Sequence, residues 1–235
     1  MEEWRPFTAA RLFAMIHIMN ASGVPRLAPS LLAADFSHLA DAVCAIESRS
    51  GAFVHIDVMD GVFVPEISFG EPVLRSLRPL TKLPFDVHLM VAQPETHVES
   101  FAAAGADYIT FHAEAAIHQH RTVHLIHQMG KKAGIAIVPS TPVSQLAEIL
   151  PFVDIVLVMT VNPGFSSQKM IMRCTEKIRD LAALRAQNHY VYLISADGGI
   201  NAKTIASVTD AGVDIAVSGS AFFSGELNGN ASVLS

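Results

Sequence analysis

Cysteines and long apolar runs are both scarce in this chain of 235 residues. The two cysteines, Cys44 and Cys174, cannot build a disulfide framework, and their spacing fits no zinc motif. We expect two buried thiols in a reducing compartment. No apolar run reaches the roughly 18 residues that a membrane span needs. The acidic start of the chain, followed by a short apolar segment without a clear cleavage site, does not look like a secretory signal. A cytoplasmic protein without a membrane partner is therefore expected.

A strong positive charge and nucleotide-binding glycine motifs are also missing. The net charge is −6, which argues against a nucleic-acid partner. Residues 29–33, at the end of the first predicted strand, contain no glycine, so the dinucleotide fingerprint of an open doubly wound sheet is absent. No P-loop motif indicates a nucleotide triphosphate. Lys131 and Lys132 precede a predicted strand and Lys203 lies in a predicted helix, which disfavours a Schiff-base aldolase or decarboxylase.

Apolar strand-like runs alternate with segments of helical period along the whole chain. Eight such units predict a parallel sheet with helices outside, and eight is the number that closes a (β/α)8 TIM barrel. We expect an α/β fold with a single domain at 25–223, an N-terminal extension at 1–24 and a short C-terminal tail at 224–235. The predicted strands are 26–32, 52–58, 85–90, 107–112, 134–138, 153–159, 190–196 and 213–218.

Local signals predict where several helices begin and end. Asp35 is placed to cap a helix, and Pro94 with Glu95 is typical of a first helical turn. Gly105 and Gly212 are placed to end helices just before strands.

Polar residues interrupt three of the predicted strands near their C-terminal ends. His55 and Asp57 are two apart and so share a strand face, His88 occupies the next strand, and Asp197 ends the seventh. In a barrel these ends meet at the catalytic rim. Buried polar side chains there are costly unless they pair or bind metal. Two imidazoles and two carboxylates suit one divalent ion per chain, namely zinc, iron, manganese or cobalt, and the sequence does not choose among them.

A divalent ion beside two acids has a clear chemical use. It can polarise a ketone and stabilise the enediolate formed when a neighbouring carbon loses its proton. Acids on opposite sides of that planar intermediate can remove a proton from one face and return it to the other, which is epimerisation. Met59, Met90 and Met159 follow the same strands and can form a lining that keeps water away without taking the proton.

Three late segments, at 162–168, 197–199 and 218–221, are rich in glycine and serine and suited to backbone donation to an anion. Phosphates in barrels commonly bind at the loops after the seventh and eighth strands. A phosphorylated substrate is therefore predicted. Lys169 and Arg173 are expected to be solvated charges on the following helix.

With these residues identified, the chain resembles the ribulose-phosphate 3-epimerase family. The resemblance spans about residues 26 to 223 and rests on the segments 28–36, 55–65, 86–90, 158–165, 197–199 and 219–220. It implies a barrel that interconverts D-ribulose 5-phosphate and D-xylulose 5-phosphate with a divalent metal. A homo-oligomer is the assembly that the resemblance suggests.

By motif match, the resemblance makes His55, Asp57, His88 and Asp197 the metal ligands, Asp57 the proton acceptor and Asp197 the proton donor. It implies that Ser30 and His88 contact the substrate. The predicted substrate-binding set is completed by Met59, Met90, Met159, Gly164, Phe165, Ser166, Ser167, Gly198, Gly199, Gly219 and Ser220.

The chain also departs from the family pattern. Ser166 and Ser167 stand where the family has glycines, Glu66 replaces an asparagine, and Ser195 stands where an acid is usual. The last helix is expected to be truncated. These departures leave open a ketohexose phosphate such as allulose 6-phosphate as substrate, or a sugar-phosphate binder that has lost turnover.

Overall fold

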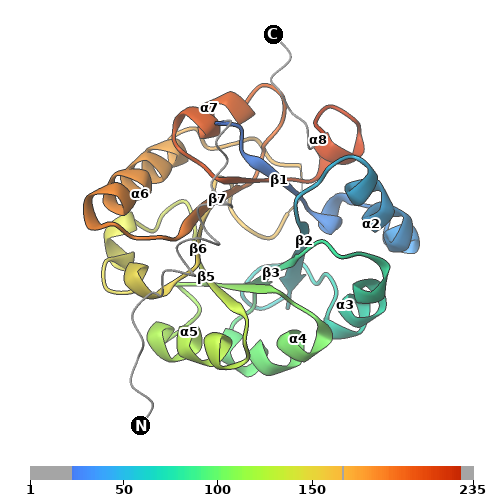
Figure 1. Ribbon diagram of the computed structural model, residues 1–235, viewed down its shortest axis with the longest axis horizontal. Coiled ribbons are helices and arrows are strands. Elements are labelled where there is room, and N and C mark those ends of the chain that lie inside the picture. The colour runs from blue at the N-terminus through green and yellow to red at the C-terminus, as the bar shows by residue number, and fades with distance from the viewer. Residues whose placement is uncertain (1–22, 166, 229–235) are drawn as a thin grey trace.

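The computed structural model describes residues 23–165 and 167–228. Eight parallel strands form one sheet in the order β1-β8-β7-β6-β5-β4-β3-β2. A parallel bridge between Ser30 and His55 brings the end of β1 beside β2, so the sheet curls into a barrel. The helices lie outside the ring of strands (Figure 1). The predicted (β/α)8 barrel is confirmed.

The elements have the following bounds. The strands are β1 (Arg26–Pro29), β2 (Val54–Met59), β3 (Phe85–Met90), β4 (Tyr108–His112), β5 (Lys132–Ile137), β6 (Ile155–Met159), β7 (Leu193–Asp197) and β8 (Ile215–Ser218). The α-helices are α2 (Leu39–Ser48), α3 (Glu71–Leu77), α4 (Val98–Ala104), α5 (Gln119–Gln128), α6 (Cys174–Asn188), α7 (Ile205–Asp210) and α8 (Ser220–Phe223). The 3-10 helices are η1 (Leu31–Ala33), η2 (Phe36–His38), η3 (Arg78–Leu80), η4 (Pro94–Thr96), η5 (Val143–Leu146) and η6 (Leu150–Phe152).

The ends of several elements follow from capping side chains. The first strand stops at Pro29, earlier than predicted, because the side chain of Ser30 accepts from the Leu32 N–H and starts η1. Asp35 accepts from the Ser37 N–H and caps η2, which leads into α2. The expected stop of α4 is confirmed, since Gly105 has a φ of +112° at its end.

Alternate residues of each strand face different environments. The outer face of β2, with Ile56 and Val58, joins the large apolar core under the helices. The inner face of β2 carries His55 and Asp57, and Phe53 below them belongs to a smaller cluster that fills the barrel. The apolar filling therefore sits beneath the polar residues of the rim.

The described part of the chain end packs onto the barrel. Leu227 is buried in the main core, and its carbonyl oxygen accepts from the Arg49 guanidinium at 3.3 Å. The last helix, α8, has only four residues, as expected from the sequence. Residues 1–22 and 229–235 of the predicted extension and tail lie outside the described residues. The expectation of two buried thiols was half wrong, because Cys174 is buried and Cys44 is exposed on α2.

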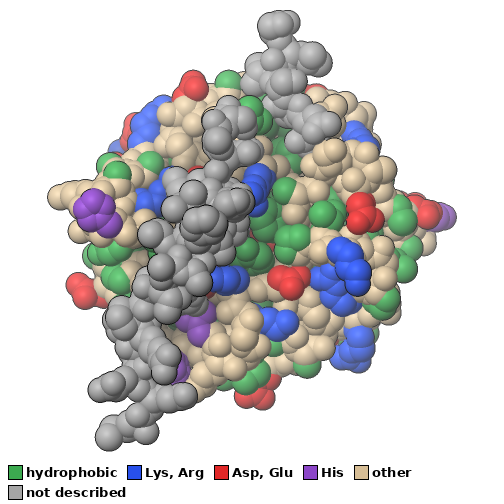
Figure 2. Space-filling view, in the orientation of Figure 1, with side chains coloured by type: hydrophobic (Ala, Val, Ile, Leu, Met, Phe, Trp, Pro, Cys, Tyr) green, Lys and Arg blue, Asp and Glu red, His purple; other side chains and the backbone are tan. Residues whose placement is uncertain are grey.

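On the face in Figure 2, acidic and basic side chains are interspersed, with no broad patch of one sign among the described residues. Between residues 23 and 228, leaving aside residue 166, no helix is both long enough and apolar enough to span a membrane.

Candidate active site

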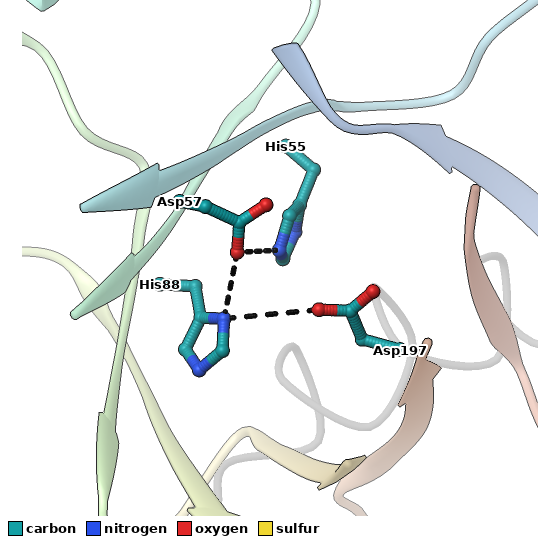
Figure 3. A group of neighbouring side chains, drawn as sticks. All are labelled: His55, Asp57, His88 and Asp197. Carbon is teal, nitrogen blue, oxygen red and sulfur yellow. Dashed lines mark hydrogen bonds and ion pairs between the residues drawn. The ribbon is translucent and has the colours of Figure 1, made fainter. Parts of the chain in front are cut away.

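Strand register brings the predicted ligands together. Asp57 of β2 lies beside His88 of β3, and Asp197 is the last residue of β7. Each of the four side chains His55, Asp57, His88 and Asp197 offers one nitrogen or oxygen atom, and these atoms lie within 4.8 Å of one another. Figure 3 shows His55 and Asp57 side by side on one strand, with His88 and Asp197 facing them from other strands.

Asp57 is the centre of the contacts in this cluster. Its Oδ1 lies 3.2 Å from His55 Nε2 and 2.9 Å from His88 Nδ1. Its Oδ2 accepts a hydrogen bond from Ser30 Oγ at 2.5 Å. Asp197 is held less tightly, with its Oδ2 4.0 Å from His88 Nδ1. The histidine side chains are fully buried, whereas 17% of the Asp197 side chain is exposed. Asp197 is therefore the acid more open to a substrate.

The surroundings of Asp57 and Asp197 shift the pKa values of their carboxyl groups in opposite directions. Burial opposes the shift, but His55 and then His88 lower the pKa of Asp57 below its ordinary range. Burial and the charge of Asp57 raise the pKa of Asp197 to about 6. Burial alone would lower the pKa of His55, yet Asp57 and Asp86 raise it well above its ordinary value. Carboxyls with divergent pKa values suit opposite acid and base roles.

Further polar residues orient the two histidines from behind. His55 Nδ1 lies 2.8 Å from Asp86 Oδ2. His88 Nε2 lies 2.9 Å from His112 Nε2, and His112 Nδ1 lies 3.2 Å from Glu114 Oε2. Burial lowers the pKa of His112 to about 4. Roles for Asp86, His112 and Glu114 were not predicted. The spacing of His112 and Glu114, two apart at a strand end, repeats that of His55 and Asp57 and is the signal that could have revealed them.

The donor set fits a single divalent metal ion. Two nitrogens and two carboxylates make a mixed site that suits zinc and similar ions. Each histidine turns one nitrogen toward the cluster and holds the other against Asp86 or His112, as metal-binding histidines do.

A cavity of about 330 Å³ opens over Asp57 and Asp197. This volume is at the lower end of the roughly 300–1,000 Å³ of ligand pockets. The register places Met59 beside Met90 on β2 and β3, and Met159 beside Asp197 on β6 and β7, so the methionines lie at two separate parts of the barrel rim. The predicted residues that line the cavity are Ser30, Asp57, Met59, Met90, Met159, Gly164, Phe165, Ser167, Asp197, Gly198, Gly199, Gly219 and Ser220. His55 and His88 lie behind this lining, and Ser166 lies outside the described residues.

The late loops approach one another too closely for side chains. Gly198 has a φ of +120°, and a Cβ there would lie 2.4 Å from Val161 Cγ2. Gly199 has a φ of +66°, and a Cβ there would lie 2.5 Å from Met170 N. Both positions thus require glycine. The backbone is left free to face the cavity, as anion binding would need.

Comparison with known proteins agrees with this geometry. The ribulose-phosphate 3 epimerase family matches residues 26–223. The chain belongs to this family. It is 58% identical to ribulose-phosphate 3-epimerase of Treponema pallidum over 201 residues, covering 86% of this chain and 92% of that protein. It is 43% identical to the Bacillus subtilis protein of the same name, covering 84% and 92%. The family resemblance found in the sequence is confirmed.

A fold match to solved structures is more distant. A variant of the tryptophan synthase α-subunit from Pyrococcus furiosus matches with a TM-score of 0.62 at 13% identity. It covers 85% of this chain and 88% of that one. At this identity the match supports the barrel fold alone.

The departures from the epimerase family pattern have distinct structural outcomes. Ser167 has a φ of +58°, in the left-handed region that glycine adopts without strain. Glu66 is exposed and does not line the cavity. Ser195 is buried, and its Oγ finds no hydrogen-bond partner among the described residues.

Two charged residues that line this epimerase-family cavity, Lys169 and Glu226, were not predicted to do so. Lys169 is exposed, as expected, but it precedes α6 instead of lying on that helix, and it lines the cavity. Arg173 also precedes α6, as its N-cap residue, and is exposed. Glu226, from the predicted tail, lines the cavity as well, and its Oε1 accepts from the Ala202 N–H at 3.1 Å.

Proposed function

We propose that the protein is a metal-dependent 3-epimerase that interconverts D-ribulose 5-phosphate and D-xylulose 5-phosphate. The observation that carries the proposal is the meeting of Asp57 and Asp197 in one cluster beneath a cavity with glycine loops. The relatives are named ribulose-phosphate 3-epimerase, which supports a ribulose phosphate as substrate and reaction at C3.

In the proposed mechanism, Asp57 and Asp197 exchange the C3 proton with opposite faces of the sugar. Asp57 removes the proton from one epimer, and Asp197 protonates the planar enediolate from the other side. In the reverse direction the roles exchange. When bound, a divalent cation supplies positive charge that offsets the negative charge developing on the substrate oxygens. His55 and His88 hold Asp57 in place, since both contact the same carboxylate oxygen.

The surroundings of the acids support this chemistry. Met59, Met90 and Met159 line the cavity and carry no acidic proton, so they can exclude water without competing for the C3 proton. The backbones at Gly198, Gly199 and Gly219 are proposed to bind the phosphate group. Lys169 adds a positive charge to the same cavity.

Proton exchange at C3 tests the proposal directly. The protein, loaded with zinc, manganese, iron or cobalt, is incubated with each pentulose phosphate in D₂O and followed by proton NMR. We expect deuterium at C3 and formation of the other epimer. Allulose 6-phosphate serves as the competing substrate, and chelator-treated protein as the control. Absence of exchange with every metal would contradict the proposal, and faster turnover of allulose 6-phosphate would reassign the substrate.

Further properties follow from the proposal and have simple measurements. We propose one zinc, iron, manganese or cobalt ion per chain, which elemental analysis of the purified protein tests. We propose a cytoplasmic enzyme that assembles as a homo-oligomer, which cell fractionation and light scattering test.

A further inference from the structure

Four side chains form a continuous line of contacts from the cluster to Glu114, just after the end of β4. Asp57 contacts His88, His88 contacts His112, and His112 contacts Glu114. We propose that Glu114, acting through His112, is a positioning residue that fixes which nitrogen of His88 carries the proton. This inference rests on the metal site of the proposed function.

The orientation of His88 sets the first step. Its Nδ1 lies 2.9 Å from Asp57 Oδ1 and 4.0 Å from Asp197 Oδ2, so this nitrogen faces the cluster (Figure 3). A histidine that binds metal through Nδ1 has its lone pair there and carries its proton on Nε2. His88 Nε2–H must then donate to an acceptor on its other side.

The acceptor on that side is another histidine. His112 Nε2 lies 2.9 Å from His88 Nε2, and both rings are fully buried. Two N–H groups cannot face each other at that distance, so His112 Nε2 must present its lone pair. The proton of neutral His112 is then on Nδ1, where Glu114 Oε2 lies 3.2 Å away and accepts it.

Glu114 can play this role because its own orientation is fixed. Its Oε1 accepts from the Val138 N–H at 2.9 Å and from the hydroxyl of Thr141. These donors come from the segment after β5 and occupy the oxygen that points away from His112. The other oxygen, Oε2, is left as a pure acceptor facing the ring. Each hydrogen bond in the line is therefore donated toward Glu114. His88 Nε2–H donates to His112 Nε2, and His112 Nδ1–H donates to Glu114 Oε2.

Asp86 orients His55 as His112 orients His88, but Asp86 contacts the other ring nitrogen, Nδ1. Its Oδ2 lies 2.8 Å from His55 Nδ1, while His55 Nε2 faces Asp57. The two histidines thus present different nitrogens to the cluster, Nε2 from His55 and Nδ1 from His88. Their tautomers should differ, and each can be measured in the same sample.

Glu114→Gln is the decisive substitution because it changes an acceptor to a donor without changing shape. The Val138 N–H and Thr141 hydroxyl hold the Gln carbonyl oxygen, so the amide NH₂ faces His112 Nδ1. His112 must then carry its proton on Nε2, opposite His88 Nε2. His88 can relieve this clash only by moving its proton to Nδ1, where metal must bind.

The experiment uses the full chain loaded with Zn²⁺, which is diamagnetic. Long-range ¹⁵N–¹H correlation spectra report the tautomer of each histidine, with residues 88 and 112 assigned by single substitutions. We expect Nε2–H for His88 and Nδ1–H for His112 in the unsubstituted protein. Zn²⁺ affinity is measured by competition with a chromophoric chelator. We expect Glu114→Gln to weaken it about 10- to 100-fold.

Thr141→Val is the matched control. It removes one donor to Glu114 Oε1 but leaves the acceptor that faces His112. We expect a lower melting temperature with Zn²⁺ affinity and tautomers unchanged. The inference is overturned if His112 carries its proton on Nε2 in the Zn²⁺-loaded protein. It is also overturned if Glu114→Gln binds Zn²⁺ normally, or if Thr141→Val weakens binding equally. Failure of the unsubstituted protein to bind any of zinc, iron, manganese or cobalt would overturn this inference together with the metal site of the proposed function.

Discussion

Replacing Asp57 or Asp197 with asparagine should separate the two halves of the proposed epimerisation. An enediolate formed by one acid can be reprotonated by that same acid on the same face, which exchanges the C3 hydrogen with solvent without inversion. Inversion needs the second acid. Asp197→Asn should therefore retain exchange for the epimer that Asp57 deprotonates and lose exchange for the other. Asp57→Asn should show the reverse pattern.

The magnitude follows from the loss of one general acid or base. Such a loss slows epimerisation about 10²- to 10⁴-fold, or about 3–5 kcal/mol in activation free energy. The effects on folding should differ. Asp57→Asn removes a buried carboxylate that contacts Ser30, His55 and His88, so we expect it to destabilise by about 3–5 kcal/mol.

Asp197→Asn should instead stabilise the metal-free protein at pH 7. Its folded pKa, about 6, lies above the ordinary value of 3.8, so the folded state holds the carboxyl proton more tightly than the unfolded chain. The ionised form then destabilises the fold as the pH rises through 6, and asparagine removes this cost. Urea unfolding of both variants at pH 5 and pH 7 measures the difference.

The assay follows deuterium at C3 from each pure epimer by proton NMR, at saturating metal. Metal content and circular dichroism of each variant are the controls. Loss of exchange from both epimers in a folded, metal-loaded Asp197→Asn protein would refute the assignment of one acid to each face. Inversion at the rate of the unsubstituted protein in either variant would refute the two-acid scheme.

Other predictions concern the surrounding residues. Asp154→Asn should cost about 3 kcal/mol at pH 7, because His127 Nε2 and Lys132 Nζ lie 2.7 and 3.0 Å from this buried carboxylate. The pKa of Asp154 lies below 3.8, so this difference should shrink as the pH falls below about 4, which urea unfolding checks. Ser167→Gly should relieve about 1 kcal/mol of backbone strain at φ +58° and lower KM more than it changes kcat; a higher KM in steady-state kinetics would contradict this. Gly198→Ala should destabilise by about 2–3 kcal/mol because its Cβ would meet Val161 at 2.4 Å, and thermal melting should show it.

The cluster of His55, Asp57, His88 and Asp197 was predictable because the geometry of parallel strands largely determines where these side chains lie. His55 and Asp57 share a face by strand period alone, and the barrel carries the ends of β2, β3 and β7 to one rim. Glycine loops after the last strands were predictable for the same reason. The roles of these residues in binding and catalysis stay predictions.

The residues behind the cluster could not be predicted in the same way. The contact between His88 and His112 depends on the curvature of the barrel and on the rotation of the imidazole rings. The two-residue period of a strand predicts neither of these. Glu226 reaches the cavity from the predicted C-terminal tail, because burial of the neighbouring Leu227 holds that segment against the barrel. Such contacts arise from tertiary packing and leave only weak local signals.

The cluster is arranged so that a cation resolves its electrostatic conflict. Asp57 makes a close contact with each histidine, but its negative charge, together with burial, raises the pKa of Asp197. Without a metal, the second carboxyl therefore faces a site that disfavours its ionisation. A bound divalent cation would offset the negative charge of Asp57 and so favour the ionised form of Asp197. The electrostatic arrangement that destabilises the metal-free cluster is thus one that would favour binding of a cation.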